Sequence, residues 1–380
     1  MEIGLQPSAA DPCLYVMRRG RNIARCAIYV DDLCISSDST SLMDYITGEL
    51  KQRFELTGPN PISALLGCSV NYDREEGICT LSQSVMIRNI HARFIGEGGN
   101  PPEVDVPSEC IKQATRRIRS TPADATIQEL EPLSSDDPEI DEIKGIYASL
   151  IGSMLFVASC TRPDISFAIS TLSKFNSAPG RAHLTKALQL LGYLNKTNSW
   201  VLPLHPRADG VLSFLPALKE GQSRGPLCVL TDASWNSTRP PSGWLVCYDG
   251  SSIAWQCRRL TITPLSSAEA EALAASRAAV IAINMRDVHG HMVMDPREVQ
   301  PPVTIYTDSV SAQALAADAS SHRRVKHISI RISMLVEACE SGAIKVAHIP
   351  GADNVSDLFT KANAGGSIAA RHRLRAALVN

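Results

Sequence analysis

Short apolar runs separated by turn residues predict strands in the first part of the chain. Residues 13–19 (CLYVMRR) and 23–30 (IARCAIYV) predict two strands joined at GRN, and residues 33–36 (LCIS) predict a third. Residues 41–56 place apolar side chains at helical spacing until TGPNP ends the pattern. Residues 62–90 then predict a strand, a turn around REEG, a second strand and a helix that begins near Ser82.

The middle of the chain divides into an irregular stretch and a helical one. Residues 97–142 are dominated by Pro, Gly, Ser and acidic residues, which predicts a long loop or linker that is partly disordered. Helical spacing resumes in residues 146–159, 162–175 and 182–196. A second break at 218–226 (LKEGQSRGP) has no apolar residue between Leu218 and Leu227, so we expect it to be exposed and easily cut.

The order of elements after residue 227 indicates the fold class. Residues 227–235, 243–250 and 252–260 predict three consecutive strands joined by short turns, and residues 266–285 predict a helix rich in alanine. The pattern continues with a strand at 303–309, helices at 310–318 and 323–341, a strand at 343–350 and a helix from Val355. Three antiparallel strands followed by alternating helix and strand predict an α/β fold, in which a mixed five-stranded sheet carries helices on both faces.

Composition limits the partners and the compartment. The 380 residues suffice for two or three domains, and the net charge of −2 gives no overall basic field, so nucleic acid would meet local patches at 116–119, 322–331 or 371–375. Each patch taken alone also has an ordinary explanation as a solvated face. The 11 cysteines include no C-x-x-C pair, which argues for a reducing compartment and against a disulfide framework or zinc ribbon. No stretch has the apolar length of a membrane span and no secretory signal is present, so we expect no membrane partner and a cytoplasmic location, with the nucleus as the alternative.

Acidic residues stand where predicted strands end or predicted helices begin, at Asp232, Glu271, Asp308 and Asp357. Ligand sites in such sheets gather at the strand ends, so these carboxylates could converge. Hard oxygen ligands suit Mg²⁺, and a pair of such ions can activate water and stabilise the leaving oxygen of a phosphodiester. Each acid taken alone is also explained by capping or turn chemistry.

Helix geometry separates the roles of Glu269 and Glu271. The residues SSAE at 266–269 form a capping box with Ser266 as the N-cap. Two residues further on, Glu271 points about 200° around the helix from Glu269, so only one of them can face a shared metal site. We assign the cap to Glu269 and the metal to Glu271.

A second acidic feature interrupts the apolar run AIYVDDLCISS at 27–37, where Asp31 and Asp32 are adjacent. Burying an ionised carboxylate is costly unless a cation or a donor pairs with it. The pair therefore predicts either a tight turn or a metal site.

At this point the sequence resembles the Pol polyprotein of copia-type LTR retrotransposons, from near its first residues to beyond residue 360. The motifs that carry the resemblance occur in the family's order: ADPCLY, YVDDLCI, LGCSV…GICTLSQ, YASLIGSMLFVASCTRPDISFAISTLSKF, TDASW, SGWLVCYDGSSIAWQCRR, LSSAEAEALA, IYTDSVSA, RVKHISIR and NVSDLFTK. The DD pair alone is weak evidence, whereas the ordered series is specific.

The resemblance implies four parts: a partial reverse transcriptase palm of α+β type at 1–96, an acidic Pro/Ser-rich linker or insert at 97–142, a helical thumb or connection region at 143–217, and a ribonuclease H-like domain at 222–380. It implies that YVDD is the hairpin of a polymerase palm, where Asp31 and Asp32 bind Mg²⁺ and nucleotide phosphates and Tyr29 lies near the primer end. A palm also requires an earlier third Asp, which the 30 residues before Asp31 do not supply, so we expect no polymerisation by this chain alone.

Within the ribonuclease H-like part, the resemblance maps the family's metal-binding acids onto Asp232, Glu271, Asp308 and Asp357. The implied activity is endonucleolytic hydrolysis of RNA in RNA–DNA hybrids with Mg²⁺, or with Mn²⁺ as the alternative ion. The implied partners are that hybrid, a template–primer and other parts of the polyprotein. A phosphate-contacting face is expected, with a plain solvated helix as the alternative, at Arg323, Arg324, Lys326 and Arg331.

Two rival functions stay open. A non-enzymatic remnant or a domesticated nucleic-acid-binding module would keep the fold without the chemistry, although none of the four acids is missing. A DDE-type recombinase is the enzymatic rival, and both the Asp–Glu–Asp–Asp order and the YVDD segment speak against it. We assign His348 to a structural role because it lies on a strand, and we expect residues 222–380 to fold without the remainder of the chain.

Overall fold

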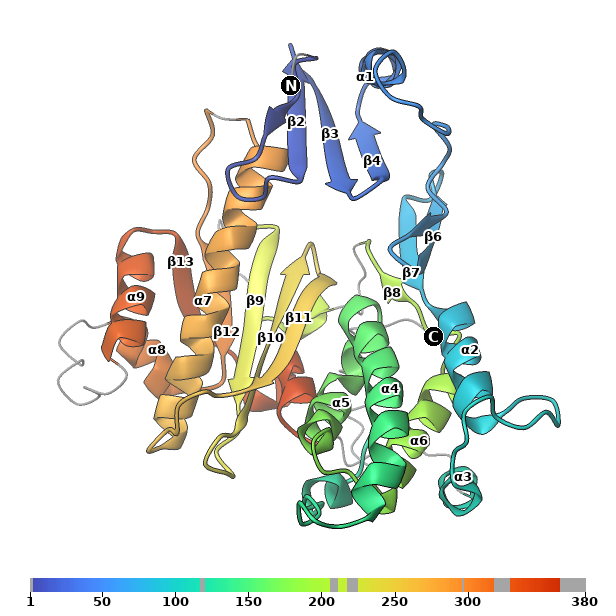
Figure 1. The fold of residues 1–380 in the computed structure, drawn as a ribbon. Coiled ribbons are helices and arrows are strands. Elements are labelled where there is room, and N and C mark those ends of the chain that lie inside the picture. The colour runs from blue at the N-terminus through green and yellow to red at the C-terminus, as the bar shows by residue number, and fades with distance from the viewer. Residues whose placement is uncertain are drawn as a thin grey trace.

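A computed structural model describes residues 3–116, 120–205, 211–216, 225–295, 297–317 and 329–362. A small N-terminal sheet lies at one end, a larger C-terminal sheet lies below it, and a group of helices lies beside the larger sheet (Figure 1). In each of these parts, the apolar positions of the sequence pattern are the ones that the fold buries.

The N-terminal sheet is antiparallel and consists of β1 (Gln6–Pro7), β2 (Leu14–Arg19), β3 (Asn22–Tyr29) and β4 (Asp32–Ser37), in that order. The helix α1 (Thr40–Lys51) begins after Ser39, whose side chain accepts a hydrogen bond from the backbone of Leu42. Its apolar residues at helical spacing, Leu42, Ile46 and Leu50, are buried against the sheet. The three strands and the helix predicted in this region are confirmed.

A second small sheet joins distant parts of the chain. It contains β5 (Ala64–Leu65), β6 (Cys68–Asp73), β7 (Ile78–Ser82) and β8 (Leu202–Pro203), and the helix α2 (Ser84–Ile95) follows β7. In this sheet Leu81 of β7 pairs with Leu202 of β8. The segment that leads into the C-terminal sheet is therefore attached to the N-terminal half.

The helical part has one apolar core. Its elements are α3 (Ser108–Thr115), η1 (Ala125–Gln128), α4 (Glu139–Cys160), η2 (Pro163–Ile165), α5 (Ser166–Leu172), η3 (Ser173–Phe175) and α6 (Arg181–Lys196). Part of the stretch predicted as a loose linker belongs to this core, because Cys110, Ala114 and Ile127 are buried in it. The acidic and Pro-rich composition of residues 97–142 masks these few apolar anchors.

The helix α4 corrects the expectation that no stretch has the length of a membrane span. By length and composition alone it could cross a membrane, with a mean hydropathy of 1.5 in its most apolar window. However, Tyr147, Leu150, Ile151 and Met154 on this helix are fully buried among the neighbouring helices. An apolar core helix passes the same test, so this one helix is weak evidence for a membrane.

The end of α4 is fixed by a buried ion pair. The guanidinium of Arg162 donates two hydrogen bonds to the carboxylate of Asp164, at 2.9 and 2.7 Å, and both side chains are buried. It also donates to the backbone carbonyl of Thr197 at 3.0 Å, and the Tyr193 hydroxyl donates to Asp164 at 2.7 Å. Because each charge is paired and hydrogen-bonded, this network can join α4 to the end of α6 without leaving an unsatisfied charge.

The C-terminal sheet has the strand order β11–β10–β9–β12–β13. Its strands are β9 (Leu227–Ala233), β10 (Pro241–Tyr248), β11 (Ser251–Arg259), β12 (Val303–Thr307) and β13 (Ile344–His348). The strands β9, β10 and β11 pair antiparallel with one another, whereas β12 is parallel to both β9 and β13. The predicted mixed five-stranded sheet and the α/β class are confirmed.

Helices cover one face of this sheet, namely α7 (Ser267–Met292), α8 (Val310–Ala317) and α9 (Ser329–Glu340). The alanines of α7 are buried against Val229 and Val246 of the sheet, where small side chains allow a close approach. The other face is covered by η8 (Val355–Phe359), by α5 of the helical part, and by η4 (Val211–Phe214). The predicted helix from Val355 is a short 3₁₀ segment over the residues that the structure describes, and it follows η7 (Gly351–Asp353).

The core beneath η8 includes residues from before the predicted domain boundary. Leu202, Val211 and Leu215 are buried there beside Cys228 and Leu230 of β9. The predicted boundary at 222 therefore cuts through a shared core, and most of the predicted break at 218–226 lies outside the described residues.

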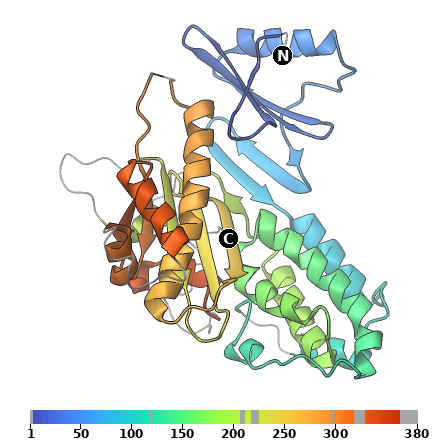
Figure 2. The same ribbon diagram turned by 60° about the vertical axis from the view of Figure 1, so that its left-hand side comes forward.

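The N-terminal sheet lies at the C-terminal end of α7 (Figure 2). Two of its arginines contact this end of the helix. Arg18 donates hydrogen bonds to the carbonyls of His291 and Met294 at 2.7 and 2.8 Å, and Arg25 donates to that of Met292 at 2.6 Å. Carbonyls at a helix C-terminus lack partners within the helix and carry partial negative charge, so cations are favoured there.

We predict that a fragment of residues 222–380 is markedly less stable than a fragment of residues 199–380. The shorter fragment loses three buried apolar side chains, and each contributes ~1.5–3 kcal/mol when fully buried. Denaturant unfolding followed by circular dichroism measures the difference. Equal free energies of unfolding for the two fragments would show that the shared core is not needed.

Candidate metal centre

Three of the predicted acids converge at one edge of the C-terminal sheet. Asp232 lies on β9 and Asp308 directly follows β12, and these two strands are parallel neighbours whose ends meet at the same edge. Glu271 reaches this edge from the second turn of α7. One carboxylate oxygen from each of Asp232, Glu271 and Asp308 lies within 4.8 Å of the other two.

The first turn of α7 distinguishes the two glutamates as the sequence predicts. The Ser266 side chain is the N-cap and accepts a hydrogen bond from the backbone N–H of Glu269 at 3.2 Å. The Glu269 carboxylate turns back and accepts from the N–H of Leu265 at 2.7 Å. Glu271 instead accepts from the N–H of Ala233, directly after Asp232, at 3.2 Å. The capping role of Glu269 is confirmed, and Glu271 is the glutamate that faces the acid cluster.

Burial makes the three carboxylates hard to ionise together. Asp232 is only 1% exposed, and burial raises its pKa to about 7, with a further increase from Asp357 and an opposing decrease from Lys361. Burial, Asp232 and Asp308 raise the pKa of Glu271 to about 9. The pKa of Asp308 is raised as well, first by burial. A bound cation would reverse these shifts, because an opposite charge nearby favours the ionised form.

The donor set fits a hard divalent cation. The Oε2 atom of Glu271 is buried and has no hydrogen-bond partner among the described residues. A buried carboxylate oxygen without a partner is costly unless a cation is bound. Oxygen ligands in this number suit Mg²⁺, which is held by few carboxylates and keeps part of its water shell.

The fourth predicted acid, Asp357, lies beside the trio but outside it. It is buried on η8 and accepts a hydrogen bond at 2.6 Å from Lys361, whose ammonium lies 3.9 Å from the Oδ2 atom of Asp232. The Thr360 hydroxyl donates to the same Asp232 oxygen. Although burial alone lowers the pKa of Lys361, Asp232 and Asp357 raise it overall, so the lysine stays charged. Lys361 and Thr360 were missed from the sequence, although Lys361 follows Asp357 by four residues and so can lie on the same side of a helical turn.

Two small features bring η8 against the sheet. The Asn354 side chain caps η8 by accepting from the backbone of Ser356, and it donates to the carbonyl of Thr231 on β9 at 3.0 Å. Gly243 on β10 pairs with Asp232, and a Cβ at Gly243 would come within 2.2 Å of the Cβ of Phe359. Only glycine leaves room for η8 at this point.

The predicted structural residue His348 lies at the same strand edge as Asp308. This residue ends β13, pairs with Thr307 in the parallel register and is exposed. Among several influences on Asp308, of which burial is the largest, a positive charge on His348 lowers the pKa of that carboxyl. The parallel pairing of β12 with β13 cannot be read from sequence alone. It places His348 at the edge of the sheet where Asp232 and Asp308 lie.

The other predicted site residues lie away from the acid cluster. Asp31 lies in the two-residue turn between β3 and β4, and Asp32 begins β4 opposite Tyr29; all three are exposed. No third acid, His or Cys in the described part of the chain joins the two acids. The tight turn is therefore observed. Arg331 lies half-buried on α9, whereas the other basic residues predicted for this face, Arg323, Arg324 and Lys326, lie outside the described residues.

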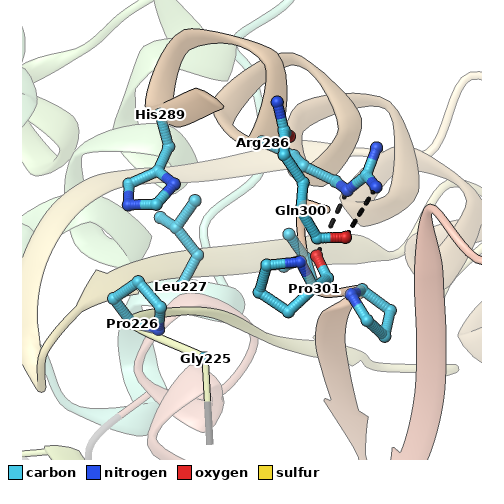
Figure 3. A pocket seen from close by; sticks show the side chains of 9 residues that line it. Gly225, Pro226, Leu227, Arg286, His289, Gln300 and Pro301 are labelled. Atoms are coloured by element: carbon cyan, nitrogen blue, oxygen red, sulfur yellow. Dashed lines mark hydrogen bonds between the residues drawn. The ribbon is translucent and has the colours of Figure 1, made fainter. Parts of the chain in front are cut away.

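A narrow hollow at the opposite end of the sheet is too small for a ligand (Figure 3). It lies where β9 and β12 begin and has a volume of about 10 Å³, which is near the minimum for one water. Its wall is the Arg286 guanidinium, which donates to the carbonyls of Gln300 and Pro301 at 3.0 and 3.2 Å. These bonds fix the second half of α7 to the segment before β12.

We predict that, in a chelator, the protein loses stability as the pH rises from ~4 towards 9. The folded state holds protons on Asp232 and Glu271 up to about pH 7 and about pH 9, whereas unfolded carboxylates release them near pH ~4. The stabilisation is therefore complete below the unfolded pKa and is lost as the pH passes the folded values. Asp232→Asn should flatten this decline in melting temperature, and the exposed Asp31→Asn should not. A decline of equal slope in Asp232→Asn and the wild type would contradict the argument.

Comparisons with known proteins agree with the motif resemblance. No family model matches the chain. Over 93% of this chain and 24% of the relative, the sequence is 26% identical to the retrovirus-related Pol polyprotein from transposon TNT 1-94 of Nicotiana tabacum. Over 95% of this chain and 22% of the relative, it is 28% identical to the retrovirus-related Pol polyprotein from transposon RE1 of Arabidopsis thaliana. The chain thus spans less than a quarter of the length of these curated relatives.

Among solved structures, RNase H1 from the archaeon Halobacterium salinarum NRC-1 matches 37% of this chain and 97% of its own, with a TM-score of 0.26 at 17% identity. The resemblance predicted from the motifs is confirmed: the chain is similar along almost its entire length to retrotransposon Pol polyproteins.

Proposed function

We propose that this chain hydrolyses the RNA strand of RNA–DNA hybrids with the help of Mg²⁺, or of Mn²⁺ in its place. The observation that carries the proposal is the group of three carboxylates at the edge of the C-terminal sheet, with ligand atoms within 4.8 Å of one another. The Glu271 Oε2 atom is buried and has no hydrogen-bond partner among the described residues, which costs folding free energy. Stability alone would favour a paired or apolar group there, so this atom supports a role in binding a cation.

Each residue of the centre has a defined part in this reaction. Asp232, Glu271 and Asp308 would hold the cation, which lowers the pKa of a bound water and neutralises charge on the phosphate. Asp357 is the remaining acid of the proposed ligand set, and in this structure it pairs with Lys361 at 2.6 Å. The Lys361 ammonium offsets part of the negative charge, so a phosphate can approach an edge that four carboxylates would otherwise make repulsive.

The exposed His348 would transfer a proton during hydrolysis. It lies at the same strand edge as Asp308 and is open to solvent, so its imidazole can exchange protons with water. Histidine is suited to this role because it changes charge near neutral pH. The distance to the reacting oxygen depends on the bound substrate, which makes the role testable by kinetics.

The β3–β4 hairpin is proposed as the remnant of a polymerase palm, with Asp31 and Asp32 at its tip. The exposure of both acids leaves them accessible to an ion and a template–primer. Such a site needs further ligands, which could come from other parts of a polyprotein. Hybrid hydrolysis does not depend on this hairpin.

The proposal is tested by purified protein, a labelled RNA–DNA hybrid, and Mg²⁺ with or without a chelator. We predict that Glu271→Gln lowers the cleavage rate more than ~100-fold, because even outer-shell partners of a metal site change activity by roughly 10–100-fold. The matched control is Glu269→Gln, which removes a charge but keeps an amide oxygen that can still accept the hydrogen bond from the N–H of Leu265, so it should leave both the cap and the cleavage rate largely unchanged. Cleavage by Glu271→Gln at the wild-type rate, or no cleavage by the wild type in Mg²⁺, would refute the proposed function.

We also predict that His348→Ala slows cleavage by roughly 10²-fold at saturating hybrid, because general acid–base catalysis contributes at least about that factor. The pH–rate profile should lose the limb that the imidazole produces, while hybrid affinity stays the same. Lys345→Ala, on the same strand and also exposed, serves as the control. An unchanged pH profile in His348→Ala would leave His348 with only its strand-pairing role.

A further inference from the structure

A polar cavity lies between the helical part and the C-terminal sheet, and the metal centre does not use it. Its volume is about 270 Å³, far above the ~10–15 Å³ that is the minimum for one water on the same measure. Phe167 and Thr171 of α5 line it together with Pro241 of β10. The polar side chains around it are Gln128, Ser170, Lys174, Asn236, Ser237 and Arg259.

The cavity brings together two cations from different parts of the chain. Lys174 belongs to η3 of the helical part and is exposed, whereas Arg259 ends β11. The guanidinium of Arg259 makes one long hydrogen bond of 3.5 Å to the Ser237 hydroxyl, and its buried Nε has no partner among the described residues. Burial and the nearby Arg259 lower the pKa of Lys174, while Cys257 and Glu131 raise it to a smaller extent. Two cations held close together with donor capacity to spare favour an anion between them.

The strand register places this cavity beside the metal centre. Asp232 on β9 pairs with Gly243 on β10, and Gly243 pairs with Cys257 on β11. Arg259 follows Cys257 by two residues and therefore lies on the same face of the sheet. Two strand spacings and two residues along β11 separate Arg259 from Asp232 by roughly 12 Å. That separation equals about three to four base pairs of rise, at ~3.4 Å each.

We propose that Lys174 and Arg259 bind a backbone phosphate of the nucleic acid that occupies the metal centre, about three to four base pairs from the cleaved bond. Ser170, Asn236 and Ser237 add neutral hydrogen-bond donors. Lys, Arg, Ser and Asn side chains are the groups that commonly contact nucleic-acid phosphates. Because one cation comes from each part, the bound strand would join the helical part to the sheet. The identity of the ligand rests on the proposed function, whereas the anion site rests on the cavity and its charges.

The test is fluorescence anisotropy of a labelled RNA–DNA hybrid with the full chain, in a chelator so that no cleavage occurs. Loss of one phosphate contact should reduce the slope of log K against log salt by ~0.9. We predict this reduction, together with a weaker Kd at low salt, for the double variant Lys174→Ala/Arg259→Gln. The conservative Lys174→Arg should keep the wild-type slope, and all variants should retain the wild-type melting temperature within a few degrees.

The matched control is Arg258→Gln, which removes the same charge from the neighbouring exposed residue on the opposite face of β11. A wild-type slope in the double variant, or an equal loss in Arg258→Gln, would overturn the phosphate site. Cleavage assays separate this outcome from the proposed function. If the double variant shows the reduced salt slope but the wild type never cleaves the hybrid, the phosphate site stands and the proposed hydrolysis is refuted. If the wild type cleaves the hybrid but the double variant keeps the wild-type slope, the proposed hydrolysis stands and the phosphate site is refuted.

Discussion

The crowding of carboxylates at one strand edge is the constraint around which the C-terminal half is built. Asp232, Glu271 and Asp308 repel one another when ionised, and burial adds to the cost. Only rigid elements can hold them within 4.8 Å, so two come from adjacent parallel strands and the third from a long helix. The alanines of α7 and the glycine at 243 serve the same need. They let α7 on one face and η8 on the other approach the sheet closely.

The same half of the molecule is not an isolated unit. The core beneath η8 contains Leu202 and Val211. In addition, β8 pairs with β7 in the N-terminal half. The indole of Trp255 on β11 donates a hydrogen bond to the carbonyl of Ala158 on α4 at 2.7 Å. The helical part thus supports the edge of the sheet that faces away from α9, and the cavity at Lys174 and Arg259 lies along this contact.

Local patterns predicted much of this arrangement, and non-local pairing decided the rest. The strands, the α7 cap at Ser266 and the separation of Glu269 from Glu271 follow from periods of two and 3.6 residues, which are visible in sequence. The role of Leu202 in a distant core and the position of His348 depend on which strands become neighbours. Composition misled at residues 97–142, because a few buried side chains such as Cys110 suffice to fix a stretch that is otherwise polar. The apolar length of α4 was also overlooked, since its glycines and serines interrupt the run.

Charge explains why a site of this kind needs cations on its flanks. The chain carries a net charge of −2, and under the proposed function a phosphodiester would approach the carboxylates of Asp232, Glu271 and Asp308 most closely. Like charges at ~4 Å repel by about 1 kcal/mol even at the dielectric constant of water, and by more where the site is buried. Lys361 reduces this repulsion within the centre, at 2.6 Å from Asp357 and 3.9 Å from Asp232. Lys174 and Arg259 lie further out, around the polar cavity, where we propose that they bind a phosphate. Under the proposed function, these flanking cations would supply the local attraction that the net charge of −2 does not.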